Sequence, residues 1–261
     1  MHAEWTSHHD GSSDTIDHLE ETMRLTTRTV HYQHQGVGFE GYLATPLGSP
    51  TPKPSIMIVH TWVGRDEFAC HKADQWAQWG YTAFAVDLYG GGKVGQTTEE
   101  NAALMNGLLS DRNLLKERLW AALDTFKAQP ETDVDRVAAM GFCFGGLSVL
   151  DLARSGADLR GVISFHGLFN APQGLPTPPI QAKILILHGF DDPMATPEDA
   201  VSLGHELTRR GADWQMHLYS NTMHAFTNPK ANDPGFGTVY NPITDDRSHQ
   251  CLLDFLTEVL K

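Results

Sequence analysis

Short apolar runs alternate with longer amphipathic stretches along most of the chain. The apolar runs, such as SIMIVH (55–60), are near-continuous, which is typical of strands buried on both faces of a sheet. The stretches between them, such as EFACHKADQWAQWG (67–80), have the length and polarity of helices that cover a sheet. Predicted strands cover 55–60, 81–89, 136–142, 160–167, 183–189 and 214–220, and predicted helices cover 67–80, 97–128, 144–155, 197–211 and 245–261.

This alternation predicts an α/β fold, with a mostly parallel sheet and helices on both faces. Before the first buried strand, residues 29–35 and 38–46 read as two strands joined around Gly36, which predicts an antiparallel pair at the sheet edge. Residues 1–22 are polar and aperiodic, so we predict a tail there, and a single domain over 23–261. Side chains that do chemistry are expected at the carboxyl ends of the parallel strands.

Composition narrows the class of protein. The chain has 261 residues, of which 41% are hydrophobic, and a formal net charge of −13, which argues against a nucleic-acid or anionic-membrane partner. No apolar run reaches the roughly 18 residues of a membrane span, and the N-terminus lacks the basic and apolar regions of a secretory signal. Three cysteines, an odd and sparse set, predict free thiols in a reducing compartment. We therefore expect a cytoplasmic protein that is a monomer or a small homo-oligomer.

The segment GFCFGG (141–146) is the most informative motif. It matches the G-x-nucleophile-x-G elbow between a strand and a helix, with Cys143 in place of the commoner serine. Glycine is needed two residues before and after the nucleophile because side chains there would collide with the neighbouring strand and helix. The N-terminus of the following helix favours a thiolate over a thiol. The alternative is a small apolar cysteine packed between strand and helix, which is the simpler interpretation for Cys70 and Cys251 in their helical runs.

Two further residues complete a nucleophile set in the order that elbow enzymes use, which is nucleophile, acid, histidine. Asp192, in HGFDDPMATP (188–197), follows a buried strand and could orient a base; Asp191 is the competing candidate. His224 follows the predicted strand 214–220 and could take the thiol proton and return it to a leaving group. Taken alone, such a loop histidine is usually a surface residue, so the ordered set is what favours catalysis.

Backbone amides are the expected donors to a developing oxyanion. The N–H of Phe144 is free at the start of the predicted helix, and the loop after the first buried strand supplies a second donor, either Trp62 or Thr61. The Trp62 side chain could also line an acyl pocket. His60 and His188 stand at strand ends and are interpreted as hydrogen-bonded supports.

Together with AVDLYG (85–90) and HAF (224–226), these motifs resemble the dienelactone hydrolase family from about Val30 to the C-terminus. The resemblance implies an α/β-hydrolase fold and hydrolysis of carboxylic esters or lactones through an acyl-thioester intermediate, without cofactor or metal ion. It also implies a triad of Cys143, His224 and Asp192, with oxyanion amides from Trp62 and Phe144.

Three positions depart from the family pattern. Members that act on dienelactone carry a glutamate after the third strand and two arginines that hold the substrate carboxylate; the matching positions here are Thr61, Gly91 and Asn228. Each lost charge-assisted hydrogen bond is worth roughly 1.5–3 kcal/mol, so we expect a neutral or weakly polar ester or lactone. The candidate substrate-binding residues are Thr61, Tyr89, Phe142 and Asn228. The loop 227–242 is expected to shape specificity and to act as a lid.

Other motifs and functions remain as alternatives. GVGFEG (36–41) has the letters of a dinucleotide fingerprint but runs into a predicted strand, so we interpret it as a hairpin turn, and GGGK (90–93) lacks the Ser or Thr of a phosphate-binding loop. The histidines and aspartates of 1–22 have no spacing typical of a closed metal site. A hydrolase-fold protein that binds a small ligand without turnover is the main alternative function, and a redox thiol is the second.

Overall fold

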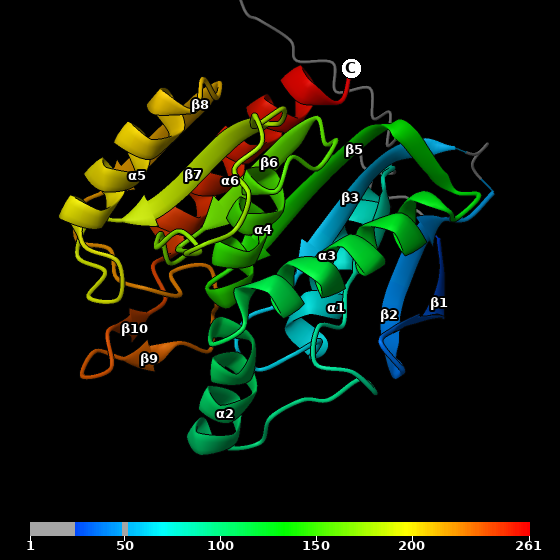
Figure 1. Ribbon diagram of the computed structural model, residues 1–261, viewed down its shortest axis with the longest axis horizontal. Helices are drawn as coiled ribbons and strands as arrows, with labels where there is room; N and C mark the ends of the chain where they lie inside the picture. Colours follow the sequence, from blue (N-terminus) through cyan, green and yellow to red (C-terminus); the bar gives the residue numbers. More distant parts are fainter. Residues whose placement is uncertain (1–23, 49–51) are drawn as a thin grey trace, which may run out of the picture.

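The computed structural model describes residues 24–48 and 52–261. The predicted tail at 1–22 lies outside these residues. The chain forms an eight-stranded sheet with the order β1-β2-β4-β3-β5-β6-β7-β8, shown in Figure 1. The strands are β1 (Leu25–His34), β2 (Val37–Pro46), β3 (Lys53–Val59), β4 (Thr82–Ala85), β5 (Thr132–Phe142), β6 (Gly161–Phe165), β7 (Lys183–Gly189) and β8 (Trp214–Tyr219).

The six strands from β3 to β8 are parallel, and β1 and β2 form the antiparallel edge that the sequence predicts. The turn between β1 and β2 has positive φ at Gln35 (48°) and Gly36 (77°), and Val30 pairs with Gly41 across the hairpin. GVGFEG is therefore a hairpin turn, as expected. β2 pairs antiparallel with β4 and so attaches the hairpin to the parallel strands.

Helices cover both faces of the sheet, as Figure 1 shows. On one face, α1 (Glu67–Gln78) and α6 (Pro242–Val259) pack on a core that includes Met140 and Phe165. On the other, α3 (Arg112–Lys127), α4 (Phe144–Arg154) and α5 (Pro197–Arg209) pack on a core that includes Val59 and Ile186. The strands in the middle of the sheet are buried on both sides, which explains why their sequences are apolar throughout.

The prediction of one helix over 97–128 is wrong. Two helices occupy this stretch, α2 (Thr98–Leu109) and α3, and the chain turns between them at Ser110 and Asp111. The Asp111 side chain accepts a hydrogen bond from the N–H of Leu114 at 2.9 Å, so it acts as the N-cap of a new helix. The apolar pattern continues across this break, which concealed it in the sequence.

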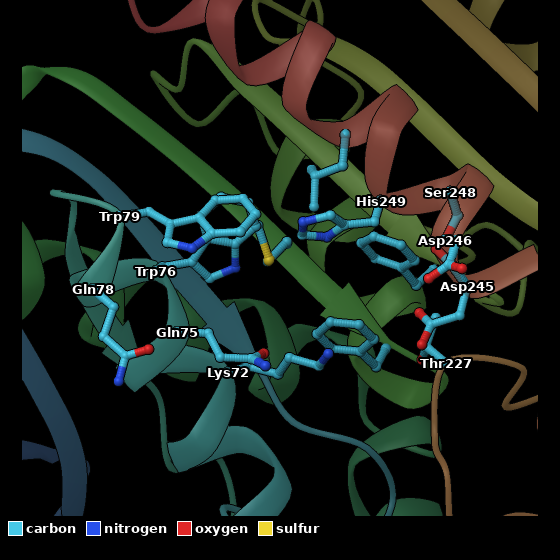
Figure 2. A pocket seen from close by; sticks show the side chains of 14 residues that line it. Lys72, Gln75, Trp76, Gln78, Trp79, Thr227, Asp245, Asp246, Ser248 and His249 are labelled. Carbon is cyan, nitrogen blue, oxygen red and sulfur yellow. The ribbon is translucent and has the colours of Figure 1, made fainter. Parts of the chain in front are cut away.

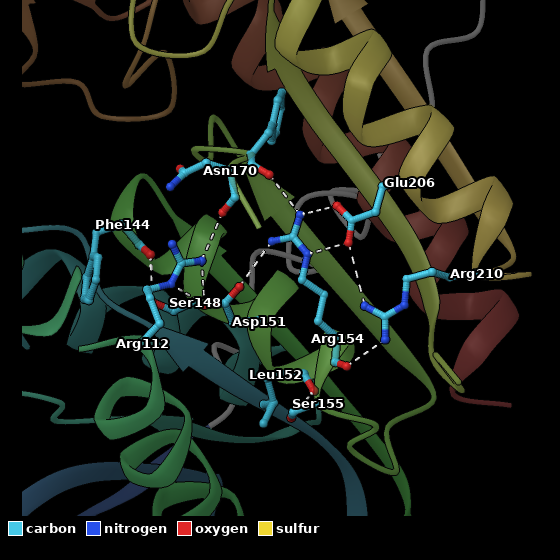
Figure 3. Close-up of polar contacts among 11 residues, drawn as sticks. Arg112, Phe144, Ser148, Asp151, Leu152, Arg154, Ser155, Asn170, Glu206 and Arg210 are labelled. Atoms are coloured by element: carbon cyan, nitrogen blue, oxygen red, sulfur yellow. Dashed lines mark hydrogen bonds and ion pairs between the residues drawn. The ribbon is translucent and has the colours of Figure 1, made fainter. Parts of the chain in front are cut away.

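A buried ionic network fixes the C-terminal half of α4 (Figure 3). Asp151 lies between Arg112 of α3, at 2.6 Å, and Arg154, at 3.2 Å. Arg154 is itself 4% exposed and pairs with Glu206 of α5 at 2.7 Å. It also donates to the carbonyl oxygen of Phe169 at 2.8 Å. The network thereby ties α3, α4, α5 and the segment after β6 into one rigid support.

Candidate active site

Cys143 lies on the sharp turn between β5 and α4 at the carboxyl edge of the sheet. Its backbone has φ 57° and ψ −117°, a strained combination for a residue with a side chain. A Cβ on Gly141 would overlap the carbonyl of Gly145, and a Cβ on Gly145 would overlap the carbonyl of Val59. The collisions expected at these two positions are thus confirmed, because strand, helix and neighbouring strand meet there backbone to backbone.

His224 and Asp192 come together beside this turn. The Nδ1 atom of His224 lies 2.7 Å from Oδ2 of Asp192, and the two residues are 1% and 2% exposed. Asp192 also accepts the N–H of Met194 at 2.8 Å, which fixes the carboxylate within its loop. The competing Asp191 is exposed to solvent, so Asp192 is the residue that the fold places against the imidazole.

The backbone of His224 is further held by a small hairpin, formed by β9 (Asn232–Asp233) and β10 (Thr238–Val239). The backbone N–H of His224 donates to the carbonyl of Gly237 at 3.0 Å, and its carbonyl accepts the N–H of Val239 at 3.0 Å. The Nε2 atom is buried and makes no hydrogen bond of normal geometry with other described residues. It is therefore the ring atom available to the Cys143 thiol.

The thiol and the imidazole alter each other's protonation. Burial raises the pKa of the Cys143 thiol, but the charge of His224 and the amides of Phe144 and Trp62 together bring the pKa below its ordinary value. Burial lowers the pKa of His224, but the thiolate and Asp192 outweigh it and raise the pKa to about 10. Both shifts favour the ionised forms, thiolate and imidazolium, over the neutral thiol and imidazole.

The two predicted amide donors, those of Phe144 and Trp62, lie beside the Cys143 sulfur, and their N–H groups help to lower the pKa of the thiol. The Trp62 amide belongs to the loop after β3, whose position is fixed because the Tyr89 hydroxyl donates to the Trp62 carbonyl at 2.8 Å. Thr61, the alternative donor, uses its carbonyl oxygen to contact Nδ1 of His60 at 2.6 Å. His60 is fully buried and also accepts the N–H of Leu88 through Nε2, at 3.3 Å.

A cavity of about 250 Å³ opens next to Cys143 and His224. Most of its wall is apolar, and no lysine or arginine occurs among the described residues that line it. Among the described residues of the wall, Asp66 is the one carboxylate, and its Oδ1 accepts the N–H of Ala69 at 3.2 Å as the N-cap of α1. The apolar lining residues are Trp62, Val63, Phe68, Met105, Leu168, Met194, Ala225, Ala231 and Phe236.

Two of the four predicted substrate-binding residues, Thr61 and Asn228, line this cavity, and two do not. Tyr89 is 6% exposed and lies behind the Trp62 loop as a support. Phe142 points to the opposite face of the sheet and lines a separate cavity of about 270 Å³ between α1 and α6, shown in Figure 2. Side chains alternate along a strand, so the residue before the nucleophile faces away from the pocket.

The loop 227–242 contributes Ala231, Phe236 and Thr238 to the cavity wall. Phe236 stacks on Trp62 with ring centroids 5.7 Å apart, and it is 46% exposed. This aromatic pair is at the junction of the β3 loop and the hairpin. The loop is thus part of the pocket, whereas its movement as a lid stays a prediction.

His166, at the end of β6, is a cavity residue to which sequence reasoning gave no role. It is 2% exposed and has φ 38°. Its Nδ1 atom accepts the backbone N–H of Cys143 at 3.2 Å, and its Nε2 atom lies 2.9 Å from the Thr227 hydroxyl. The position at a strand end was the one available signal, because the contacts join segments far apart in sequence.

The model of the dienelactone hydrolase family matches residues 39–260. The chain belongs to the dienelactone hydrolase family. A structure titled m3DLH has 35% identical residues and a TM-score of 0.84, and the match covers 91% of this chain and 99% of that one. A dienelactone hydrolase-like promiscuous phosphotriesterase from metagenomic libraries has 32% identity, a TM-score of 0.85 and the same coverage.

Among curated relatives, a putative carboxymethylenebutenolidase of Aquifex aeolicus is 25% identical over 237 residues, which is 89% of this chain and 98% of that protein. More distant α/β hydrolases share the fold. The chain is therefore a dienelactone hydrolase-like hydrolase with an α/β-hydrolase fold.

Over residues 24–48 and 52–261, no cluster of three or more His, Cys, Asp or Glu side chains is placed to hold a metal ion. Within the same residues, no helix has the length and apolar character needed to cross a membrane.

Proposed function

We propose that this hydrolase cleaves neutral carboxylic esters or lactones, with Cys143 as nucleophile, His224 as base and Asp192 as the residue that orients it. The observation that carries the proposal is the placement of the His224 ring. One nitrogen is held by Asp192 at 2.7 Å, and the other is free and faces a thiol whose pKa is lowered.

The reaction follows from this arrangement. The Cys143 thiolate attacks the carbonyl carbon, and the carbonyl oxygen takes the negative charge and accepts hydrogen bonds from the Trp62 and Phe144 amides. The tetrahedral intermediate collapses to a thioester, and the imidazolium of His224 gives its proton to the departing alkoxide. His224 then removes a proton from water, which attacks the thioester and releases the acid and the thiol. In a lactone the leaving hydroxyl stays attached to the product.

The wall of the cavity supports a neutral substrate. It is mostly apolar and has no lysine or arginine among its described residues, so a substrate carboxylate would lose its hydration without gaining an ion pair with either side chain. The curated relative from Aquifex aeolicus is named for an enzyme of carboxymethylenebutenolide, an anionic lactone. We infer that this chain hydrolyses neutral esters and lactones better than a lactone that carries a carboxylate.

The nucleophile requires a reduced thiol. Cys70, Cys143 and Cys251 are all free, which supports a reducing compartment such as the cytoplasm as the place of action.

The test combines alkylation and turnover. Wild type, Cys143→Ala and the matched control Cys251→Ala are assayed on short p-nitrophenyl esters, on neutral lactones, on an anionic lactone and on a phosphotriester. We expect Cys143→Ala to lose turnover by about 10³-fold or more, and Cys251→Ala to keep it. Iodoacetamide should label Cys143 first and abolish activity in step with labelling.

The outcomes separate the alternatives. Turnover that survives Cys143→Ala overturns the mechanism. Fast labelling of Cys143 without turnover of any substrate in the panel would instead support a non-catalytic ligand-binding protein, the second candidate that the free thiol allows.

A further inference from the structure

His166 connects two segments that the proposed mechanism needs to keep in register. Cys143 and His224 belong to loops after β5 and β8, which are separated along the chain by β6 and β7. His166 follows β6 and contacts both loops, through the Cys143 N–H at 3.2 Å and the Thr227 hydroxyl at 2.9 Å. Thr227 lies three residues after His224 in the same loop.

The hydrogen bonds fix the protonation state of this ring. Nδ1 accepts the N–H of Cys143, so it carries no proton, and the remaining ring proton is on Nε2, which donates to Thr227. Burial and the nearby charges of His224, His188 and Lys72 hold the pKa of His166 well below its ordinary value. His166 is therefore a neutral imidazole with one defined tautomer.

A neutral His166 is also compatible with a positive charge on the neighbouring ring of His224. The centroids of His166 and His224 are 5.0 Å apart, with the rings edge to face. A protonated His166 would place a like charge against the imidazolium of His224 and would lose the bond from Cys143. Both effects would disfavour the ion pair of thiolate and imidazolium.

We propose that His166 is a positioning residue, a neutral brace that ties the backbone of Cys143 to the loop of His224 and keeps their side chains in reacting geometry. The proposal rests on the proposed function, since it concerns the same thiol and imidazole. The backbone supports it, because φ is positive at Cys143 (57°), at His166 itself (38°) and at Ala225 (58°), which lies in the His224 loop. The Cys143 N–H also donates to Phe165 at 3.0 Å, a bond that holds β5 to β6 but does not reach the His224 loop.

Three variants separate the two contacts. His166→Asn keeps an acceptor near the Nδ1 position and loses the bond to Thr227. Thr227→Val removes the same bond from its other end, and His166→Phe removes both contacts. The readouts are kcat and KM on a p-nitrophenyl ester, and the pH profile of Cys143 alkylation by iodoacetamide; thermal unfolding confirms that each variant is folded.

We expect His166→Phe to lower kcat by at least about tenfold with little change in KM, and to move the alkylation midpoint to higher pH. His166→Asn and Thr227→Val should each have a smaller effect, and the double variant should be no worse than the worse single one, since both lose one bond. Folded His166→Phe with a wild-type kcat and pH profile overturns the proposal, and so does a variant that is only less stable.

This test distinguishes the brace from the reaction it serves. Alkylation of Cys143 needs no turnover, so a shifted profile in His166→Phe supports the brace even if Cys143→Ala retains esterase activity. An unshifted profile rejects the brace even if the esterase mechanism holds.

Discussion

The two ends of α4 hold buried polar groups in opposite ways, and both ends appear in Figure 3. At the C-terminal end, Asp151 and Arg154 pair with each other, and each has a further partner of opposite charge, Arg112 and Glu206 respectively. At the N-terminal end, Cys143 has a strained backbone and makes no side-chain cap, and the adjacent imidazole leaves one nitrogen free. The same helix thus connects a structural end, where the charged groups have partners, to a reactive end, where one imidazole nitrogen has none.

The pKa directions at the two ends make the same contrast. Burial raises the pKa of Asp151 above its ordinary value, although Arg112 and Arg154 act to lower it. Burial also raises the pKa of Cys143, but there His224 and two amides outweigh it. Relative to the ordinary pKa values, the surroundings therefore shift the protonation equilibrium toward the ionised form at the reactive end and away from it at the structural end. Activity and stability should accordingly respond to different substitutions.

The largest expected effect comes from His224→Gln, which removes the free imidazole and should lower kcat by about 10⁴-fold or more while the protein stays folded. The charge of His224 is the largest effect that opposes burial, so the pKa of Cys143 rises when the imidazole is removed. Alkylation by iodoacetamide should slow at neutral pH and reach its midpoint at higher pH than in wild type. An unchanged alkylation profile would contradict the thiolate–imidazolium pair.

A large effect on stability, but not on chemistry, is expected for Arg154→Met. It leaves Asp151 and Glu206 without their shared partner, and breaking a buried pair of this kind costs about 3–5 kcal/mol of unfolding free energy. Urea unfolding measures this cost, with the exposed Arg209→Met as control. If kcat of the folded variant fell as steeply as the stability, the two ends of α4 would not be separable.

The smallest effect is expected at the mouth of the cavity. Phe236→Ala removes an aromatic ring from the cavity wall; a pair between this ring and an aromatic ester is worth about 0.5–1.5 kcal/mol, so KM for such an ester should rise about 2–10-fold. Neither kcat nor unfolding free energy should change much, because Phe236 is 46% exposed. Phe190→Ala, also exposed but outside the cavity wall, is the matched control. Equal KM values for the two variants would remove Phe236 from the substrate site.

Periodicity and the glycines around Cys143 were enough to predict the sheet, its antiparallel edge and the elbow, because these depend on local pattern and close backbone contact. The alternation of side chains along β5 also places Phe142 on the far face of the sheet, away from the cavity beside Cys143. The strand-end position of His166 could be predicted from the sequence, but its role could not, since its contacts are with Cys143 and Thr227, which come from other segments. The break between α2 and α3 was missed because the apolar pattern continues through it.

The most direct test of the central claim is to trap the intermediate. Wild-type protein is mixed with p-nitrophenyl butyrate, quenched in acid within the first turnovers, digested and analysed by mass spectrometry. The account predicts a butyryl group on the peptide that contains Cys143, and none on that peptide in Cys143→Ala. A butyryl group on another residue that forms and decays at the rate of turnover would contradict it.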